Sequence, residues 1–192
     1  MTDTSSASSS PRHIGPYEIV RKLGEGGMGA VYLGKHRVLE VEHAIKVLPE
    51  RFAKDEQFVA RFLREARSAA RLNHPNIVQV VGADAWDGGH YLAMQYIEGR
   101  GLDVLMRSDG PLPAHTAVRY IYQTAEALGF AHQAGIIHRD VKPENILIDL
   151  RNDARLTDFG LVREAQATLD QPQLTVEGSF LGTRSEEHTS EL

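Results

Sequence analysis

The sequence predicts an α+β fold of two lobes, a β-rich lobe followed by a helical one. Between residues 17 and 48 the chain consists of short runs of β-branched and aromatic residues separated by turn residues, a pattern typical of hairpins. Apolar residues then recur at helical spacing over Glu56–Leu72 and over Pro113–Gln133. We expect a hinge between the lobes near Gln95–Gly99, because the second, longer helical pattern begins after it.

Strand candidates open the first lobe. They begin at Tyr17 (YEIVRKL), Ala30 (AVYLGKH) and Glu42 (EHAIKVL), and a glycine cluster separates the first two. Two further candidates, Ile77–Val81 and Tyr91–Ile97, are joined by a loop that contains an Asp-Gly-Gly sequence. Short runs bounded by such turn residues favour an antiparallel sheet made of hairpins.

One amphipathic helix is expected inside this sheet lobe, over Glu56–Leu72. The run Asn73–His74–Pro75–Asn76 ends it, because proline and asparagine favour a turn at that point. The apolar side chains predicted on one face of this helix are Phe58, Phe62, Ala66 and Ala69.

The second lobe is predicted to begin with helix and to return to short strands. The apolar residues spaced three or four apart over Pro113–Gln133 are Val118, Ile121, Ala125, Leu128 and Ala131. Short apolar pieces follow at Ile146–Ile148 and Ala154–Thr157, each next to a polar loop.

Composition limits the classes of protein to consider. The chain has 192 residues, enough for one domain, and 21 basic against 26 acidic residues give a net charge of −5. This mild acidity argues against general nucleic-acid binding. The absence of cysteine excludes a disulfide scaffold or thiolate metal site and fits a reducing compartment such as the cytoplasm. No apolar run reaches the roughly 18 residues needed to span a bilayer, and Ser-rich residues 1–13 predict a disordered leader.

A glycine-rich loop follows the first strand. Gly24–Val31 reads G-E-G-G-M-G-A-V, and glycines let the backbone N–H groups lie close to a phosphate. Alone, this match is weak, because a flexible hairpin turn has the same composition. The residues after Gly29 read as a strand, whereas a dinucleotide-binding loop continues into a helix. A Walker loop is also disfavoured, because no Lys-Ser or Lys-Thr follows the last glycine.

Lys46 and Glu65 are predicted to form an ion pair. Lys46 is a charge inside the apolar strand His43–Leu48, and Glu65 lies at the edge of the apolar face of the following helix. Each is explained singly as a solvated charge, but a half-buried charge is unfavourable without a partner. Lys46 could then hold a phosphate oxygen while Glu65 fixes its position.

Catalytic chemistry is predicted for the run Ile137–Asn145 (IHRDVKPEN), which is followed thirteen residues later by Asp158-Phe159-Gly160. An acid that accepts a hydroxyl proton, a lysine beside it, and asparagine and aspartate oxygens for Mg²⁺ suit phosphoryl transfer. A charged surface turn explains the first motif alone, and the second motif alone carries little information. Their order and separation favour the catalytic interpretation.

Taken together, these motifs over residues 17–183 resemble the protein kinase family. The resemblance implies a bilobal kinase fold with an N-lobe over 17–97 and a partial helical C-lobe over 98–183. It also implies a catalytic base at Asp140, a lysine on the transferred phosphate at Lys142, and Mg²⁺ ligands at Asn145 and Asp158. Lys46, held by Glu65, would contact the ATP phosphates. The ATP-binding positions implied in this way are Leu23, Gly24, Gly26, Gly27, Gly29, Val31, Ala44, Lys46, Met94, Gln95, Ile97 and Leu147.

The sequence Lys142-Pro143-Glu144 resembles the serine/threonine form of the family, and GEGGMGAVYLG and HRDVKPENILID resemble its bacterial branch. Arg139 before the catalytic aspartate implies control by phosphorylation of the activation segment. We take Thr175 as the main phosphoacceptor, ahead of Thr168 and Ser179, because it lies eight residues before Thr183. The implied cofactors are ATP and Mg²⁺, and the implied partners are protein substrates and a second copy for autophosphorylation.

The pattern changes after Thr183, where kinases continue into a substrate-binding loop and further helices. Residues 184–192 read RSEEHTSEL, the in-frame translation of a widely used sequencing-library adapter, and we interpret them as an artefactual tail. On this interpretation the chain is an incomplete fragment, and membrane attachment could arise only through missing C-terminal sequence. Two alternatives remain open: a pseudokinase-like nucleotide-binding regulator and a small-molecule phosphotransferase of the same fold.

Overall fold

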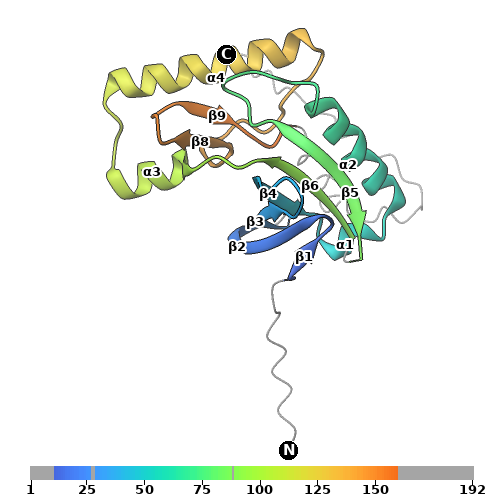
Figure 1. The fold of residues 1–192 in the computed structure, drawn as a ribbon. Coiled ribbons are helices and arrows are strands. Elements are labelled where there is room, and N and C mark those ends of the chain that lie inside the picture. Colours follow the sequence, from blue (N-terminus) through green and yellow to red (C-terminus); the bar gives the residue numbers. More distant parts are fainter. Residues whose placement is uncertain (1–10, 27–28, 88, 160–192) are drawn as a thin grey trace, which may run out of the picture.

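The computed structural model describes residues 11–26, 29–87 and 89–159, which form the two expected lobes (Figure 1). The first lobe contains, in chain order, β1 (His13–Ile14), β2 (Tyr17–Gly26), β3 (Gly29–His36), β4 (Glu42–Val47), α1 (Glu50–Ala53), α2 (Glu56–Ala69), β5 (Val80–Trp86) and β6 (Gly89–Gln95). The second contains β7 (Gly99–Gly101), α3 (Leu102–Asp109), α4 (Ala114–Gln133), the 3-10 turn η1 (Pro143–Asn145), β8 (Ile146–Asp149) and β9 (Ala154–Leu156).

Within the described residues, the strands of the first lobe form one antiparallel sheet in the order β1-β2-β3-β4-β6-β5. Strand β4 lies between β3 and β6, and its register sets Lys46 opposite Val31 on one side and Leu92 on the other. The sheet therefore holds this lysine in the middle of a paired strand, where its backbone is fixed on both edges.

Helix α2 packs against the sheet with the face that the sequence predicts. Its buried residues are Phe58, Phe62, Ala66 and Ala69. Asp55 caps its first turn by accepting hydrogen bonds from the backbone N–H groups of Gln57 and Phe58, at 2.9 and 3.0 Å. The helix ends at Ala69, three residues earlier than expected, and Leu72 is buried beyond its end.

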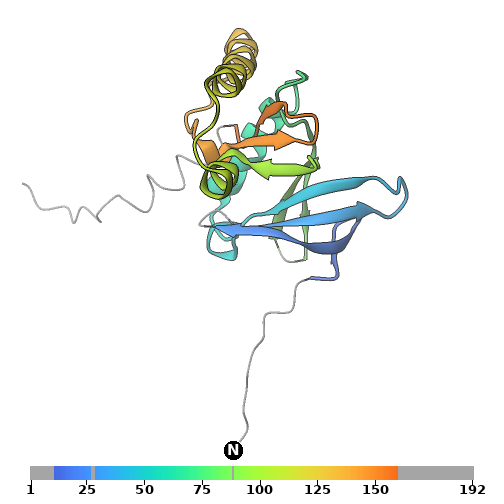
Figure 2. The same ribbon diagram turned by 90° about the vertical axis from the view of Figure 1, so that its left-hand side faces the viewer.

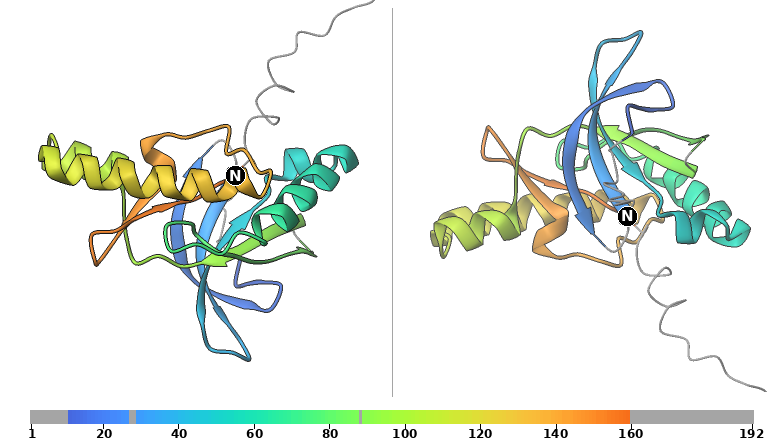
Figure 3. Two further views of the ribbon diagram at one scale, coloured as in Figure 1. Left: turned by 90° about the horizontal axis from the view of Figure 1, so that it is seen from above. Right: turned by 90° about the horizontal axis from the view of Figure 1, so that it is seen from below.

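The second lobe packs helix α4 against a three-stranded antiparallel sheet of order β7-β8-β9. In Figure 2 the β8–β9 hairpin lies between α4 and the strands of the first lobe. Seen from above and below, α2 and α4 extend toward opposite sides of the molecule (Figure 3). The hairpin that leads to Asp158 thus occupies the centre of the structure.

The buried face of α4 differs from the predicted one, although the helix itself has the predicted bounds to within one residue. Its buried residues are Tyr120, Thr124, Ala127 and Ala131, whereas Val118 and Ile121 are 65% and 69% exposed. Polar contacts also join this face to the neighbouring strands: the Tyr120 hydroxyl donates to Asn152 Oδ1, and Gln123 Oε1 accepts the Ala154 N–H at 2.8 Å. The prediction based on hydrophobic spacing was wrong for Val118, Ile121 and Ala125, which are exposed, and was confirmed for Ala131, which is buried.

The lobes are joined by backbone pairing between residues 76–78 and β9. Leu156 donates its N–H to the carbonyl of Asn76 at 2.8 Å and accepts the N–H of Val78 at 2.9 Å. The Asn76 side chain, which is buried, donates to the Ala154 carbonyl at 2.8 Å. This pairing explains why β5 begins at Val80 rather than at Ile77, because the first residues of the predicted strand belong to the interlobe contact.

The predicted disordered leader, residues 1–13, was wrong for His13. His13, which we placed in the leader, belongs to β1 and pairs with Glu18. Residues 1–10 lie outside the described residues. Among the helices of the described segments, none has the length and apolar character that crossing a bilayer requires.

Candidate active site

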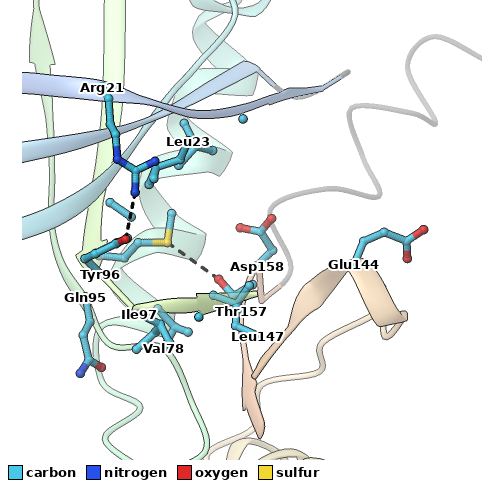
Figure 4. Close-up of a pocket in the computed structure, with 15 residues that line it drawn as sticks. Arg21, Leu23, Val78, Gln95, Tyr96, Ile97, Glu144, Leu147, Thr157 and Asp158 are labelled. Carbon is cyan, nitrogen blue, oxygen red and sulfur yellow. Dashed lines mark hydrogen bonds between the residues drawn. The ribbon is translucent and has the colours of Figure 1, made fainter. Parts of the chain in front are cut away.

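A cavity of about 450 Å³ opens between the lobes, and we call it the interlobe cavity (Figure 4). Strands β2, β3 and β4 cover it from the first lobe, the segment after β6 forms one side, and β8 with the segment after β9 forms the floor. Its lining residues are Arg21, Leu23, Gly24, Val31, Ala44, Val78, Met94, Gln95, Tyr96, Ile97, Gly99, Glu144, Leu147, Thr157 and Asp158. The lining combines aliphatic walls with charges at the edges, as small-molecule sites do.

Most of the residues that we assigned to nucleotide binding line this cavity. They are Leu23, Gly24, Val31, Ala44, Met94, Gln95, Ile97 and Leu147. Gly26, Gly29 and Lys46 lie on the strands that cover it, and Gly27 lies outside the described residues. Arg21 and Tyr96 were missed. The alternation of side chains along a strand could have identified Arg21, because Arg21 lies two residues before Leu23 and therefore on the same face of the strand.

The glycines of the loop differ in their structural roles. Gly29 has φ +108°, and a side chain there would place Cβ 2.0 Å from the Val47 carbonyl oxygen. Only glycine fits that position. At Gly24 and Gly26, by contrast, a Cβ would meet no atom of the described residues within 4 Å. The fold does not require glycine at these two positions, so the open space above them is available to a ligand.

Lys46 and Asp158 form an ion pair at the inner end of the cavity. Lys46 Nζ lies 2.8 Å from Asp158 Oδ2, and the lysine is only 7% exposed. We predicted Glu65 as the partner of Lys46, and that pair stays a prediction. Glu65 lies on α2 and lines a separate cavity of about 200 Å³ together with Arg139 and Phe159. The buried lysine thus has its compensating charge from the second lobe.

The predicted catalytic residues meet in the loop around η1. Lys142 Nζ lies 2.9 Å from Asp140 Oδ2, and Asn145 Nδ2 donates to the same oxygen at 3.0 Å and to the Asp140 carbonyl at 2.8 Å. Burial acts to raise the pKa of Asp140, but the hydrogen bonds from Lys142 and Asn145 outweigh it, so this pKa is lowered. The hydrogen bond to Asp140 raises the pKa of Lys142. Both groups are therefore charged at neutral pH.

His138 connects this loop to the segment after β9 that carries Asp158. Its Nε2 lies 2.8 Å from the Thr157 carbonyl oxygen, and its Nδ1 accepts the Asp140 N–H at 3.3 Å. These partners assign the neutral tautomer with the proton on Nε2. The ring also packs against Phe159, with centroids 4.6 Å apart. His138 is 1% exposed and is a packed member of the loop.

Comparison with known proteins identifies this arrangement. A family model described as the protein kinase domain matches residues 17–185. The chain belongs to the protein kinase family. The kinase domain of Mycobacterium tuberculosis PknI has a TM-score of 0.70 and 38% identity to this kinase, covering 77% of this chain and 59% of that one. The two lobes are thus those of the protein kinase fold.

Curated relatives include serine/threonine-protein kinases of bacteria. PrkC of Bacillus subtilis is 41% identical over 172 residues, which are 90% of this chain and 26% of that protein. PknH of Mycobacterium bovis is 45% identical over 170 residues, which are 88% of this chain and 28% of that protein. This kinase chain therefore spans about a quarter of the length of these relatives. Membership in the family implies ATP and a divalent cation as cofactors.

Two glycine variants should separate the fold of the kinase from its nucleotide binding. Gly26→Ala should leave the thermal unfolding midpoint unchanged and weaken ADP binding, because the added methyl group fills space kept for the ligand. Gly29→Ala is the matched variant and should lower the midpoint, because its Cβ collides with the Val47 carbonyl. Calorimetric titration and thermal unfolding measure the two effects. Equal losses of stability in both variants would contradict this division.

Stability of the kinase should fall as the pH drops below about 6.5, the ordinary pKa of histidine. Burial lowers the pKa of His138, and the hydrogen bond to the Thr157 carbonyl only partly opposes this effect. The unfolded chain therefore binds a proton that the folded chain does not, and stability is complete above pH 6.5 and lost on acidification toward the folded pKa.

Urea unfolding at pH 7.5 and 5.5 tests this sign. His138→Phe, which keeps a ring against Phe159, should show a smaller decrease between the two pH values than the unmodified chain. Burial also lowers the pKa of His43, so part of the decrease should remain in that variant. An unchanged decrease in His138→Phe would show that another group titrates.

Proposed function

We propose that this chain carries the catalytic site of a serine/threonine protein kinase, which transfers the γ-phosphoryl group of ATP to protein hydroxyls with Mg²⁺. The main support for this proposal is that Asp140, Lys142 and Asn145 form one hydrogen-bonded group. This group lies beside the cavity that Asp158 lines. Phosphoryl transfer depends on positioning and neutralising charge, and this group supplies both.

In the proposed step, the substrate hydroxyl oxygen attacks the γ-phosphorus and the bond from phosphorus to the β–γ bridging oxygen breaks. The hydroxyl proton passes to Asp140, and ADP leaves with the bond electrons. Lys142, held against Asp140, supplies positive charge to the transferred group. Its ammonium also keeps the Asp140 carboxylate ionised and oriented before the substrate arrives.

Asn145 and Asp158 fit a divalent cation. The Asn145 amide nitrogen is directed at Asp140, which leaves its amide oxygen as the atom able to bind a metal. Asp158 pairs with Lys46 through Oδ2, and its other carboxylate oxygen is a suitable metal donor. Oxygen donors of this kind suit Mg²⁺, which when bound would neutralise phosphate charge.

The substrate class follows from Lys142-Pro143-Glu144 and from the relatives, whose names are those of serine/threonine-protein kinases. We further propose a cytoplasmic domain that associates with a second copy for autophosphorylation, with any membrane attachment lying in additional sequence. The relatives and the complete set Lys46, Asp140, Asn145 and Asp158 do not favour a pseudokinase.

Asp140→Asn should abolish phosphotransfer while retaining nucleotide binding, because it keeps the shape of the side chain and removes the proton acceptor. Removal of a general base of this kind lowers a rate by about 10²–10⁴-fold. The measurement is transfer of labelled phosphate to protein serine and threonine, with exposed Glu126→Gln on α4 as the control. Transfer only to small alcohols would favour the alternative phosphotransferase. Nucleotide binding without any transfer by the full-length protein would favour the pseudokinase.

Regulation by phosphorylation is proposed at Thr175, which lies outside the described residues. A phosphate on Thr175 would pair with Arg139, which precedes the catalytic Asp140. Thr175→Ala should therefore lower phosphotransfer activity after preincubation with MgATP, measured against untreated enzyme. An identical activation in the variant would contradict the assignment.

A further inference from the structure

Arg21 and Tyr96 meet across the open side of the interlobe cavity. The Arg21 guanidinium Nη2 donates to the Tyr96 hydroxyl at 3.1 Å, although 75 positions separate the two residues in the sequence. Both side chains line the cavity, and Figure 4 shows them on the opposite side of it from Asp158. Arg21 belongs to β2, which carries the glycine loop, and Tyr96 belongs to the segment that follows β6.

Strand β2 is weakly held where Arg21 lies. Strand β1 pairs only with Tyr17 and Glu18 of β2, so within the described residues β3 is the single strand neighbour of β2 beyond Ile19. The pairing with β3 is itself irregular, with register shifts between Ile19 and Arg21 and between Lys22 and Gly24. An edge strand with two such irregularities has fewer ladder hydrogen bonds to fix its position.

The hydrogen bond from Arg21 gives this strand a second tether, which runs across the cavity to the segment after β6. Leu23 and Gly24, the next residues of the strand to line the cavity, follow directly after it. When a ligand fills the cavity, the strand must lie against the ligand. A hydrogen bond that already holds the strand in this place reduces the conformational entropy lost on binding. A hydrogen bond to a charged group is strong enough to influence that equilibrium, although exposure weakens it.

We propose that Arg21 and Tyr96 act as positioning residues, forming a clasp that holds the glycine-rich strand over the base end of the bound nucleotide. This inference rests on the proposed nucleotide-binding function. The clasp lies away from Lys46 and Asp158, the end at which the phosphates are expected. The clasp should therefore contribute equally to the binding affinity of ligands with and without phosphates.

The test compares adenosine and ADP as ligands of the full chain by calorimetric titration. Arg21→Ala and Tyr96→Phe should each weaken both ligands by about three- to tenfold, the effect expected of one hydrogen bond. The double variant should be no weaker than Arg21→Ala alone, because the two residues act as a unit. Arg21→Lys should restore part of the affinity. Lys35→Ala removes a like charge from β3 outside the cavity and should change neither affinity.

Each outcome has one meaning. Unchanged affinities in both single variants overturn the clasp, while the unmodified chain still binds and the proposed function stands. Failure of the unmodified chain to bind either ligand overturns the proposed function first. A loss that is larger for ADP than for adenosine shows that Arg21 acts as a charge toward phosphate and overturns the clasp. Additive losses in the double variant also overturn it. Unchanged thermal midpoints in Tyr96→Phe exclude a general folding defect.

Discussion

The short backbone pairing between residues 76–78 and Leu156 is the contact on which the site depends. It joins the first lobe to the strand that ends one residue before Thr157, and so fixes where Asp158 lies relative to Lys46. The same strand places the Thr157 carbonyl beside His138, which in turn contacts the backbone of Asp140. One set of peptide hydrogen bonds therefore aligns a cation from the first lobe with two carboxylates from the second.

Charge balance then determines what this aligned site can do. Lys46 is opposite Asp158, and Lys142 is opposite Asp140, so each carboxylate has a cation within 3 Å. The lowered pKa of Asp140 makes its carboxylate a weak base. That weakness suits a loose transition state, in which the attacking hydroxyl needs orientation more than early removal of its proton. The site is thus organised before ligands arrive, at the expense of basicity.

Much of this arrangement could be predicted from local sequence, and the exceptions have physical reasons. The family resemblance, which rests on local motifs, implied the cavity wall at Leu23, Val31 and Ala44, and these residues line the interlobe cavity. The buried face of α4 was missed, since Tyr120 and Thr124 are buried with hydrogen-bonding groups that hydrophobic spacing does not count. The Arg21 contact with Tyr96 joins residues 75 positions apart, and no local pattern reports such a meeting. The same limit applies to the contact between Lys46 and Asp158, which are 112 positions apart.

Two residues near the proposed catalytic site adopt a backbone conformation that lowers the stability of the fold. Arg139 and Asp158 adopt left-handed conformations, with φ of +67° and +63°, although neither is glycine. Such conformations cost about 1–3 kcal/mol each, and glycine would relieve that strain. Glycine would therefore stabilise the backbone at two positions where the proposed regulation needs the Arg139 guanidinium and the proposed reaction needs the Asp158 carboxylate. Attempts to engineer greater thermostability should therefore leave these two positions unchanged.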